Sequence, residues 1–498
     1  MLALPLFQHA ASKPSDAVAV YDDRGSYTWR QLLGAAVGLG RLLATGTRAD
    51  AVGILLPASG GFVASFYGTL LAGKIAVPIN FLLGDRELAH ILADSGIDTV
   101  LTAPPLAARV AGRAGLNVID LAQLPPPDPQ QLAGIDLQVM ARDTAAVPRN
   151  RVATFLYTSG TSGLPKGVVL THGNLQSDVE SAIAHAQLRG DHAFLGIVPL
   201  FHSTGLLATM VAPVQLGATT TYIARFSPVA TKNAVVERKI SVMAAVPSMY
   251  GALLRLKDAS PEDFASLYAP IAGGEPLPPT IREAFVQRFG KPLLEGYGLT
   301  ETCGPVCFNT PQHHRPGSVG RMVPGAEVRI VADDGSPRPT GEVGEIWLRG
   351  PMVMRGYHNL PDETAAALTP EGFFRTGDLG LVDADGYLHI TGRKKEMIIV
   401  AGEKVFPREV EDCLGRHPAV AEAAVLGKRD PSRGEVVVAF VVPKEGQTVT
   451  ADALRDFCRE QGLIPWKTPR EIIVTPDLPR SPTGKVLKRV LAEQLASG

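Results

Sequence analysis

The sequence predicts an α/β protein with a large N-terminal part of two α/β subdomains plus a small antiparallel β subdomain, and a small mobile α+β C-terminal domain. Two observations carry this prediction. Apolar strand-like runs alternate with helix patterns up to about residue 309, which is typical of mostly parallel sheets covered by helices. Strand-like runs joined by Asp-Gly turns then follow one another after residue 316, which indicates antiparallel pairing. The length of 498 residues fits about three structural units.

The first α/β subdomain occupies roughly the first 120 residues. Thr28 and Gln31 have the spacing of a capping box and open an apolar helix that we expect to run to about Ala44. A second helix is expected around residues 62–72. Short apolar runs predict buried strands at 52–56, 75–77, 100–101 and 118–119. The proline-rich segment 125–129 breaks the alternation and indicates a surface connection.

The second α/β subdomain is expected at about residues 152–309, and the β subdomain follows at 316–392. Within the β subdomain the predicted strands are 327–331, 344–348 and 387–390. Turns at Asp333-Asp334-Gly335 and Asp385-Gly386 join neighbouring strands. These strands therefore predict a compact antiparallel unit on the side of the larger sheets.

The C-terminal domain begins after the charged stretch Arg393-Lys394-Lys395-Glu396. We predict an N-terminal domain at 1–392, a connecting stretch at 393–396 and a C-terminal domain at 397–498. Pro407 stands at the start of an expected helix, a position that tolerates proline. Further elements are predicted as strands at 398–400, 420–426, 436–442 and 471–474, and a helix at 451–461.

Composition narrows the classes of partner. The net charge of −1 gives no electrostatic reason to expect nucleic acid or an anionic membrane as a partner. Four cysteines are too few for a disulfide framework, so we expect reduced, buried thiols. The uncharged stretch 193–224 contains prolines and three consecutive threonines, which favours buried strands and a pocket wall over a membrane span. We expect a cytoplasmic protein, because no basic signal segment precedes an apolar run at the N-terminus.

A phosphate-binding loop is the strongest local signal. The segment Tyr157-Thr158-Ser159-Gly160-Thr161-Ser162-Gly163-Leu164-Pro165-Lys166-Gly167 follows an apolar strand. Small residues let backbone N–H groups approach phosphate oxygens, hydroxyls add donors, and the lysine adds a positive charge. The pattern is not a Walker A loop, because the lysine is flanked by proline and glycine. The residues expected to bind phosphate are Thr158, Ser159, Gly160, Thr161, Ser162, Gly163 and Lys166.

This segment resembles the phosphate loop of the adenylate-forming superfamily, which comprises acyl-CoA synthetases, peptide-synthetase adenylation domains and luciferases. The resemblance covers almost the whole chain, because six further motifs occur in the family's order. They are Pro199-Leu200-Phe201-His202, Gly273-Gly274-Glu275-Pro276, Gly296-Tyr297-Gly298-Leu299-Thr300-Glu301, Thr376-Gly377-Asp378, Gly392-Arg393-Lys394-Lys395 and Pro482-Thr483-Gly484-Lys485. The resemblance implies ATP, Mg²⁺ and coenzyme A as reactants.

The nucleotide-binding motifs also have their own chemistry. Tyr297 can stack on a purine, with Gly298 beside it leaving room for a flat ring. Thr300 offers a hydroxyl to phosphate, and Glu301 offers a hard oxygen to Mg²⁺. Asp378 can accept hydrogen bonds from ribose hydroxyls, with Arg393 assisting. The resemblance places adenine between the tyrosine and the loop Gly273, Gly274, Glu275 and Pro276.

Lys485 is the expected catalytic cation. Adenylation builds negative charge on the carboxylate, the α-phosphate and pyrophosphate, and a lysine stabilises that charge electrostatically. By resemblance, Lys395 is the hinge residue, and rotation replaces Lys485 with the segment around Gly402, which helps to form the pantetheine channel. Ala401 stands where many relatives carry glycine. His202 is expected near the acyl carboxylate, where it gates the site between the half-reactions.

The predicted reaction converts a carboxylic acid and ATP to acyl-AMP, then transfers the acyl group to coenzyme A. The acyl pocket is expected at residues 201–206, around Tyr222, at 273–274 and at 296–304, which carry almost no charge. A fatty monocarboxylic acid is favoured as the substrate, because the small residues Gly205 and Gly273 are expected to leave a deep acyl pocket. Alternatives are an aromatic acid–CoA ligase, a stand-alone enzyme that loads a carrier protein, a luciferase-like oxidase and a catalytically inactive nucleotide-binding protein. A homodimer is possible.

Overall fold

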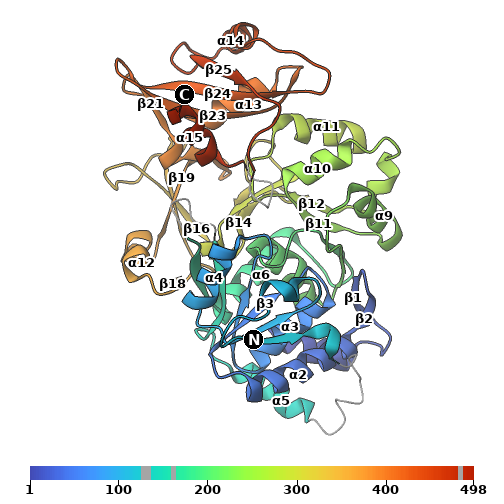
Figure 1. Ribbon diagram of the computed structural model, residues 1–498. Helices are drawn as coiled ribbons and strands as arrows, with labels where there is room; N and C mark the ends of the chain where they lie inside the picture. The colour runs from blue at the N-terminus through green and yellow to red at the C-terminus, as the bar shows by residue number, and fades with distance from the viewer. Residues whose placement is uncertain (125–135, 159–163, 481–485, 498) are drawn as a thin grey trace.

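The computed structural model describes residues 1–124, 136–158, 164–480 and 486–497, and it confirms the predicted fold class. Four sheets build the molecule, and Figure 1 shows the C-terminal sheet, in orange and red, at the end opposite the first helices. The segment 125–129, predicted as a surface connection, lies outside the described residues. The prediction of buried thiols is confirmed, because all four cysteines are free and buried.

The seven-stranded sheet has the strand order β18-β8-β7-β4-β3-β5-β6. Five neighbouring strands are parallel, whereas β8 and β18 run antiparallel. The bounds are β3 Ala51–Leu55, β4 Ile75–Pro78, β5 Thr99–Thr102, β6 Asn117–Asp120, β7 Val152–Thr158, β8 Lys166–Thr171 and β18 Gly356–Tyr357. Helix α3 (Gly60–Leu71) packs on it, and helix α2 (Trp29–Gly46) packs on α3. The capping box of Thr28 and Gln31 is present.

The nine-stranded sheet has the order β15-β14-β13-β12-β11-β9-β10-β1-β2. Its bounds are β1 Val18–Asp22, β2 Gly25–Thr28, β9 Ala193–Gly196, β10 Thr219–Tyr222, β11 Val242–Ala245, β12 Ala269–Ala272, β13 Leu294–Gly298, β14 Pro305–Phe308 and β15 Arg321–Met322. The expected division by sequence position is wrong at two places. Strands β1 and β2 join this sheet through β10, and β7 and β8 join the other sheet. Local periodicity cannot reveal these pairings, because β1 and β10 lie about 200 residues apart and β4 and β7 about 80.

Helices surround both sheets in Figure 1. Their bounds are α1 Leu4–Ser12, α4 Asp85–Asp94, α5 Leu137–Ala146, α6 His172–Ala186, α9 Pro228–Arg238, α10 Pro247–Leu254 and α11 Pro279–Phe289. The uncharged stretch 193–224 folds as β9, α7 (Ser203–Leu206), the π-helix η4 (Leu207–Val211), α8 (Ala212–Leu216) and β10. Among the helices of the described ranges, none combines the length and apolarity needed to cross a membrane.

The third sheet is antiparallel and contains β16 (Glu327–Val331), β17 (Gly344–Arg349), β19 (Phe374–Val382) and β20 (Leu388–Arg393). The sequence did not predict β19 as a strand. Helix α12 (Pro361–Ala367) lies between β18 and β19 in the chain, and both contact it.

The fourth sheet uses only strands that follow residue 397 and has its own apolar core. Its elements are β21 Ile398–Val400, β22 Glu403–Val405, α13 Pro407–Gly415, β23 Val420–Asp430, β24 Gly434–Pro443, α14 Ala451–Glu460, β25 Glu471–Val474 and α15 Lys488–Ser497. The short 3₁₀ turn η7 (Lys394–Glu396) connects β20 to β21. This turn coincides with the predicted hinge, whose mobility stays a prediction.

Candidate active site

Three of the predicted nucleotide-binding side chains meet at the junction of β13, β19 and β20. The Tyr297 hydroxyl donates a hydrogen bond of 2.7 Å to Asp378 Oδ2, and Arg393 Nε lies 3.0 Å from Asp378 Oδ1. Asp378 and Arg393 are direct cross-strand partners, which fixes their approach. Burial raises the pKa of the Tyr297 hydroxyl, so the hydroxyl stays protonated and donates. The carboxylate is only 4% exposed and is held in one orientation.

A second group surrounds Glu301, which lies in the 3₁₀ turn η6 (Thr300–Thr302) with Thr300 at its start. Tyr357 Oη donates a hydrogen bond of 2.8 Å to Glu301 Oε1. Lys166 Nζ lies 5.4 Å from the centre of the Tyr357 ring and 2.7 Å from Glu363 Oε2. The sequence analysis missed Tyr357 and Glu363. The only sequence signal was a short Gly-Tyr pair, which is too common to single out.

The two groups form one electrostatic unit. Burial raises the pKa of the Glu301 carboxyl, the Tyr357 hydrogen bond lowers it, and the charges of Arg393 and Asp378 also act on it. Glu301 therefore lies close enough to Asp378 and Arg393 for their charges to influence its ionisation. Two tyrosines, two carboxylates and an arginine are thus brought together from residues 297–301, residue 357 and the β19–β20 pair.

The predicted phosphate loop joins β7 to β8. Thr158 ends β7 and pairs in register with Lys166, which begins β8. Ser159, Gly160, Thr161, Ser162 and Gly163 lie outside the described residues. Because β8 also pairs with β18, the lysine is brought next to Tyr357, and hence to Glu301.

The glycine-rich segments are packed closely. Gly273, Gly274, Glu275 and Pro276 follow β12, and a Cβ on Gly273 would lie 3.3 Å from Gly296 O, so this loop lies against β13. A Cβ on Gly298 would lie 2.0 Å from Gly304 O. The glycine at 298 is therefore required by the close approach of β14, which is a packing reason in addition to the predicted space for a purine.

One expectation about the acyl pocket needs correction. Gly205 does not deepen the pocket, because a Cβ there would lie 2.3 Å from Pro199 O, within the backbone that precedes α7. Gly205 therefore gives no argument for a long fatty chain. Tyr222 is 2% exposed, and its hydroxyl donates to Thr209 O at 2.8 Å, so it braces the π-helix. Its place in the wall of the acyl pocket stays a prediction.

His202 precedes α7 and is half-buried. Its ring packs on Phe201 at 4.7 Å between centroids, and Phe201 packs edge-on against Phe81 at 5.1 Å. Burial lowers the pKa of the His202 imidazole to about 4, so the ring is neutral at pH 7. A neutral ring in an aromatic cluster is suited to packing beside an acyl group.

Gly402 lies in the exposed turn between β21 and β22, where a Cβ would meet no atom within 4 Å. Lys395 lies in η7 and is exposed. Lys485 lies outside the described residues. The structure therefore does not bring Gly402 to the Tyr297–Asp378–Arg393 group, as expected if it approaches only after a rotation.

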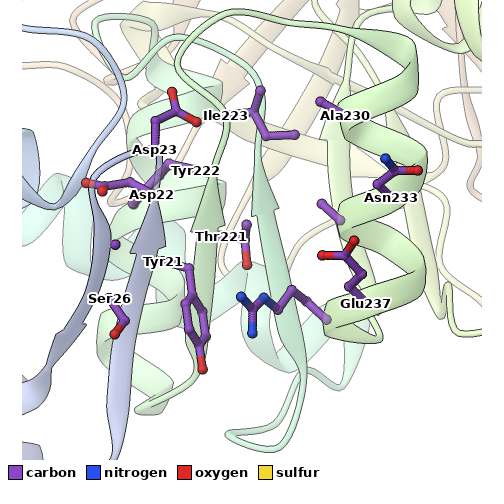
Figure 2. Close-up of a pocket in the computed structure, with 13 residues that line it drawn as sticks. Tyr21, Asp22, Asp23, Ser26, Thr221, Tyr222, Ile223, Ala230, Asn233 and Glu237 are labelled. Atoms are coloured by element: carbon purple, nitrogen blue, oxygen red, sulfur yellow. The ribbon is translucent and has the colours of Figure 1, made fainter.

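A surface cavity lies elsewhere. Figure 2 shows it between the β1–β2 hairpin, β10 and α9. Its volume is about 470 Å³. Its lining includes Tyr21, Asp22 and Glu237, and Arg238 stacks over the Tyr21 ring at 3.9 Å. Among the described residues, neither Lys166 nor the Asp378 group lines it, so this cavity does not mark the candidate site.

The residues present fit a magnesium ion that arrives with a nucleotide. Among the described residues, no group of three or more His, Cys, Asp or Glu side chains could hold a metal. Mg²⁺ commonly binds through one or two carboxylates together with substrate phosphates. Glu301 has one carboxylate oxygen bound to Tyr357, and its position close to the phosphate-loop lysine matches this mode.

Comparisons with known proteins identify the family. Residues 6–358 match the family described as AMP-binding enzyme, and residues 409–485 match its C-terminal domain. The chain is 38% identical to the sulfoacetate–CoA ligase of Cupriavidus necator, with 91% of this chain and 87% of that protein covered. It is 33% identical to the long-chain-fatty-acid–CoA ligase of Bacillus subtilis, with 90% of this chain and 86% of that protein covered. A similar solved structure is that of O-succinylbenzoate coenzyme A synthetase from Bacillus subtilis in complex with ATP and magnesium. It has a TM-score of 0.85 and 29% sequence identity, and the match covers 98% of this chain and 99% of that one.

The fold and site thus define an adenylate-forming enzyme of the AMP-forming acid–CoA ligase class. The chain belongs to the AMP-binding enzyme family. The predictions of the family, the enzyme class and the reactants ATP, Mg²⁺ and coenzyme A are confirmed. The substrates in the relatives' names are a sulfonate, a fatty acid and an aromatic acid, so they do not fix the acid used here.

Proposed function

We propose that the protein activates a monocarboxylic acid with an uncharged far end as its acyl-adenylate and then transfers the acyl group to coenzyme A. The observation that carries the proposal is the Tyr297–Asp378–Arg393 group beside Glu301 and Lys166. Asp378 would accept the ribose hydroxyls, since a carboxylate can accept about four hydrogen bonds. Glu301 would hold Mg²⁺, which neutralises phosphate charge when bound.

The acid is proposed to lie between the His202 segment and the turn that follows Glu301. The aromatic cluster of His202, Phe201 and Phe81 is neutral, which favours an uncharged acyl group. A second carboxylate or a sulfonate would need a cation to pair with it. Fatty and aromatic monocarboxylic acids both meet this requirement, and the fatty acid remains the first substrate to test.

Lys485 is proposed to stabilise the charge that builds up during adenylation. Removing one such donor from a reaction centre typically costs about 10²–10³ in rate. Because Lys485 belongs to the C-terminal residues, adenylation requires the hinge at 393–396 to bring it to the nucleotide. Rotation about Lys395 is then proposed to bring Gly402 to the acyl-adenylate for the second half-reaction.

Acid-dependent exchange of pyrophosphate into ATP tests the proposal directly, over straight-chain, aromatic and dicarboxylic acids. We expect exchange with uncharged-tail monocarboxylic acids and AMP formation that accelerates when free coenzyme A is added. Exchange without acceleration by coenzyme A would favour a carrier-protein acceptor. Absence of exchange with every acid would overturn the proposal in favour of a catalytically inactive nucleotide-binding protein.

A further inference from the structure

An unpaired acid lies in the apolar core beside the proposed acyl site. Asp178, on α6, is 1% exposed, and within the described part of the chain its Oδ1 atom has no hydrogen-bond partner. Its neighbours in sequence and at Gly304, Val179 and Leu207, both belong to a large buried apolar cluster. Burying a polar group without a hydrogen bond costs folding free energy, so such a group calls for a physical reason.

The carboxylate packs against the backbone of Gly304, where a residue with a Cβ would collide with it. A Cβ built on Gly304 would lie 2.9 Å from Asp178 Oδ2 and 3.2 Å from Leu207 Cδ1. Gly304 follows Glu301 by three residues, and Leu207 follows His202 by five. The acid therefore lies between the two segments that flank the acyl group in the proposed function.

Both of these segments have irregular backbone at this point. Cys303, immediately before Gly304, has φ 67° and ψ −56°, and Gly304 N donates to Thr302 O at 2.8 Å, which is a strained three-residue turn. Leu207 begins the π-helix η4. Strained turns and π-helices concentrate at functional sites, and here both meet the unpaired acid.

We propose that Asp178 is a specificity-determining residue that recognises a hydroxyl group on the acyl part of the substrate, so that the preferred acid is a hydroxylated monocarboxylic acid. The inference rests on the proposed function, because it assumes that the acyl group extends toward Gly304. Burial raises the pKa of the Asp178 carboxyl well above its usual value, which favours the protonated, neutral form. A neutral carboxyl offers one donor and one acceptor, as a hydroxyl does, so the two groups can satisfy each other.

Two other substrate classes fit this acid less well. A substrate ammonium group could donate one N–H to Asp178, but its other N–H groups would be left without acceptors among apolar side chains. A sulfonate or second carboxylate would meet an acid where it needs a cation. The inference therefore separates this chain from its relative named for sulfoacetate.

Matched acid pairs that differ by one hydroxyl test the inference. The pairs are straight-chain acids with and without a terminal hydroxyl, at graded lengths, and benzoates with and without a ring hydroxyl, with amino-substituted benzoates and sulfoacetate alongside. We expect kcat/KM at least tenfold higher for the hydroxylated member of the best pair, because an unpaired polar group in the site rejects the plain analogue. Equal values across every pair, or preference for the amine or the sulfonate, would overturn the inference.

Substitutions then assign the preference to this side chain. Asp178→Leu should abolish the preference by lowering kcat/KM for the hydroxylated acid, with the KM for ATP unchanged, and Asp178→Asn should retain part of it. Glu180→Gln removes an exposed carboxylate from the same helix and should leave the preference intact. If Asp178→Leu keeps the wild-type ratio while thermal unfolding shows a folded protein, the inference fails. Loss of exchange with every acid in the wild type would instead sink the proposed function itself.

Discussion

At the scale of single residues, the role proposed for Glu301 depends on the ionisation of its carboxyl. Burial raises the pKa of this carboxyl, and the hydroxyl of Tyr357 counteracts that rise by donating a hydrogen bond. In the proposed function the carboxylate must be ionised to bind Mg²⁺ together with the nucleotide. We therefore expect Tyr357 to keep Glu301 ionised over a wider pH range, although Tyr357 belongs to no recognisable motif.

Replacing Tyr357 by Phe removes this hydrogen bond and leaves the ring in place. The pKa of Glu301 should rise further, so the acid limb of the kcat/KM profile for ATP should move to higher pH. At neutral pH we expect a decrease of about tenfold, since a hydrogen bond to a charged group contributes about 1.5–3 kcal/mol. Tyr268→Phe is the control, because that hydroxyl bonds Ala186 O on α6 instead. An unchanged acid limb would show that Tyr357 does not tune Glu301.

At the scale of elements, the hairpin of β21 and β22 is held by a two-residue turn. Ala401 has φ 52° and Gly402 has φ 89°, so both central residues are left-handed, as a type I′ turn requires. A left-handed conformation costs a residue with a Cβ about 1–2 kcal/mol, whereas asparagine tolerates it. The alanine thus stores strain in the segment proposed to approach the acyl-adenylate.

Ala401→Asn should stabilise the hairpin by about 0.5–1 kcal/mol, because asparagine relieves part of that cost. Hydrogen exchange of the amides of residues 398–405 measures the effect as slower opening. Gly402→Ala is the matched opposite, which should speed opening by introducing a Cβ at a positive φ. Faster exchange in Ala401→Asn would refute the strain assigned to the turn.

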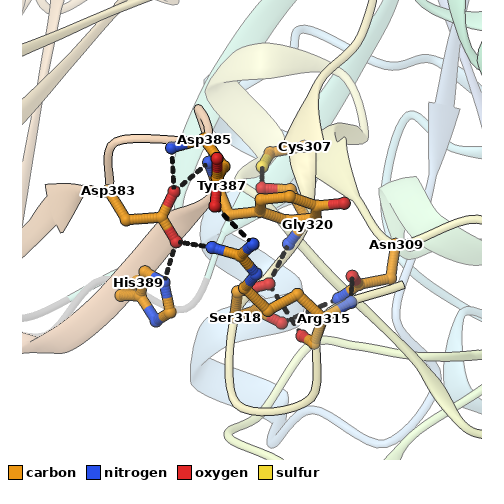
Figure 3. A network of polar contacts seen from close by, with 9 residues as sticks. All are labelled: Cys307, Asn309, Arg315, Ser318, Gly320, Asp383, Asp385, Tyr387 and His389. Carbon is orange, nitrogen blue, oxygen red and sulfur yellow. Dashed lines mark hydrogen bonds and ion pairs between the residues drawn. The ribbon is translucent and has the colours of Figure 1, made fainter. Parts of the chain in front are cut away.

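A second element, the turn between β19 and β20, is anchored by a charged network that Figure 3 shows from close by. Arg315 lies 2.6 Å from both Asp383 and Asp385, and His389 Nε2 lies 2.9 Å from Asp383 Oδ2. Burial alone would raise the pKa of Asp383, but hydrogen bonds from His389, the Tyr387 backbone and Arg315 hold it well below its usual value. The network therefore ties the loop before β15 to the sheet that carries Asp378.

Asp383→Asn should lower the free energy of unfolding by about 1–3 kcal/mol near neutral pH, because charged hydrogen bonds are lost. Because the folded pKa is depressed, this contribution is present above the unfolded pKa of about 3.8 and is lost as pH falls through the folded value. Urea unfolding from pH 3 to 8 measures this effect. The free energies of unfolding of the wild type and of Asp383→Asn should differ near neutral pH and converge at the acid end. Asp385→Asn, at a more exposed carboxylate, should change stability by less than about 0.5 kcal/mol. A difference independent of pH would contradict the assignment.

At the scale of the whole molecule, the C-terminal domain contacts the rest through charged and polar groups. Asp333 pairs with Lys404 at 3.1 Å and with Lys394 at 3.3 Å, and Lys488 bridges Glu396 of the hinge and Glu411 of α13. Exposed ion pairs such as those of Asp333 each contribute about 0–1 kcal/mol. Breaking the Asp333 pairs therefore costs little free energy, as the proposed rotation of the C-terminal domain requires.

Much of the fold was predictable from local pattern, because capping boxes, Asp-Gly turns and apolar runs act within a few residues. The capping box at Thr28 and the strand at 471–474 are examples. The pairing of β1 with β10 was not predictable from local pattern, because it joins segments about 200 residues apart. The same limit applies to the site. Motifs identified Tyr297 and Asp378, but Tyr357 and Asp178 gain meaning only from neighbours that tertiary folding supplies.

The central claim is that one C-terminal cation serves adenylation and leaves before thioester formation. The most direct measurement separates the two half-reactions in Lys485→Ala and Gly402→Leu. For Lys485→Ala the account predicts pyrophosphate exchange reduced by about 10²–10³, with thioester formation from supplied acyl-adenylate nearly unchanged, and the opposite pattern for Gly402→Leu. Equal losses of both half-reactions in Lys485→Ala would contradict it.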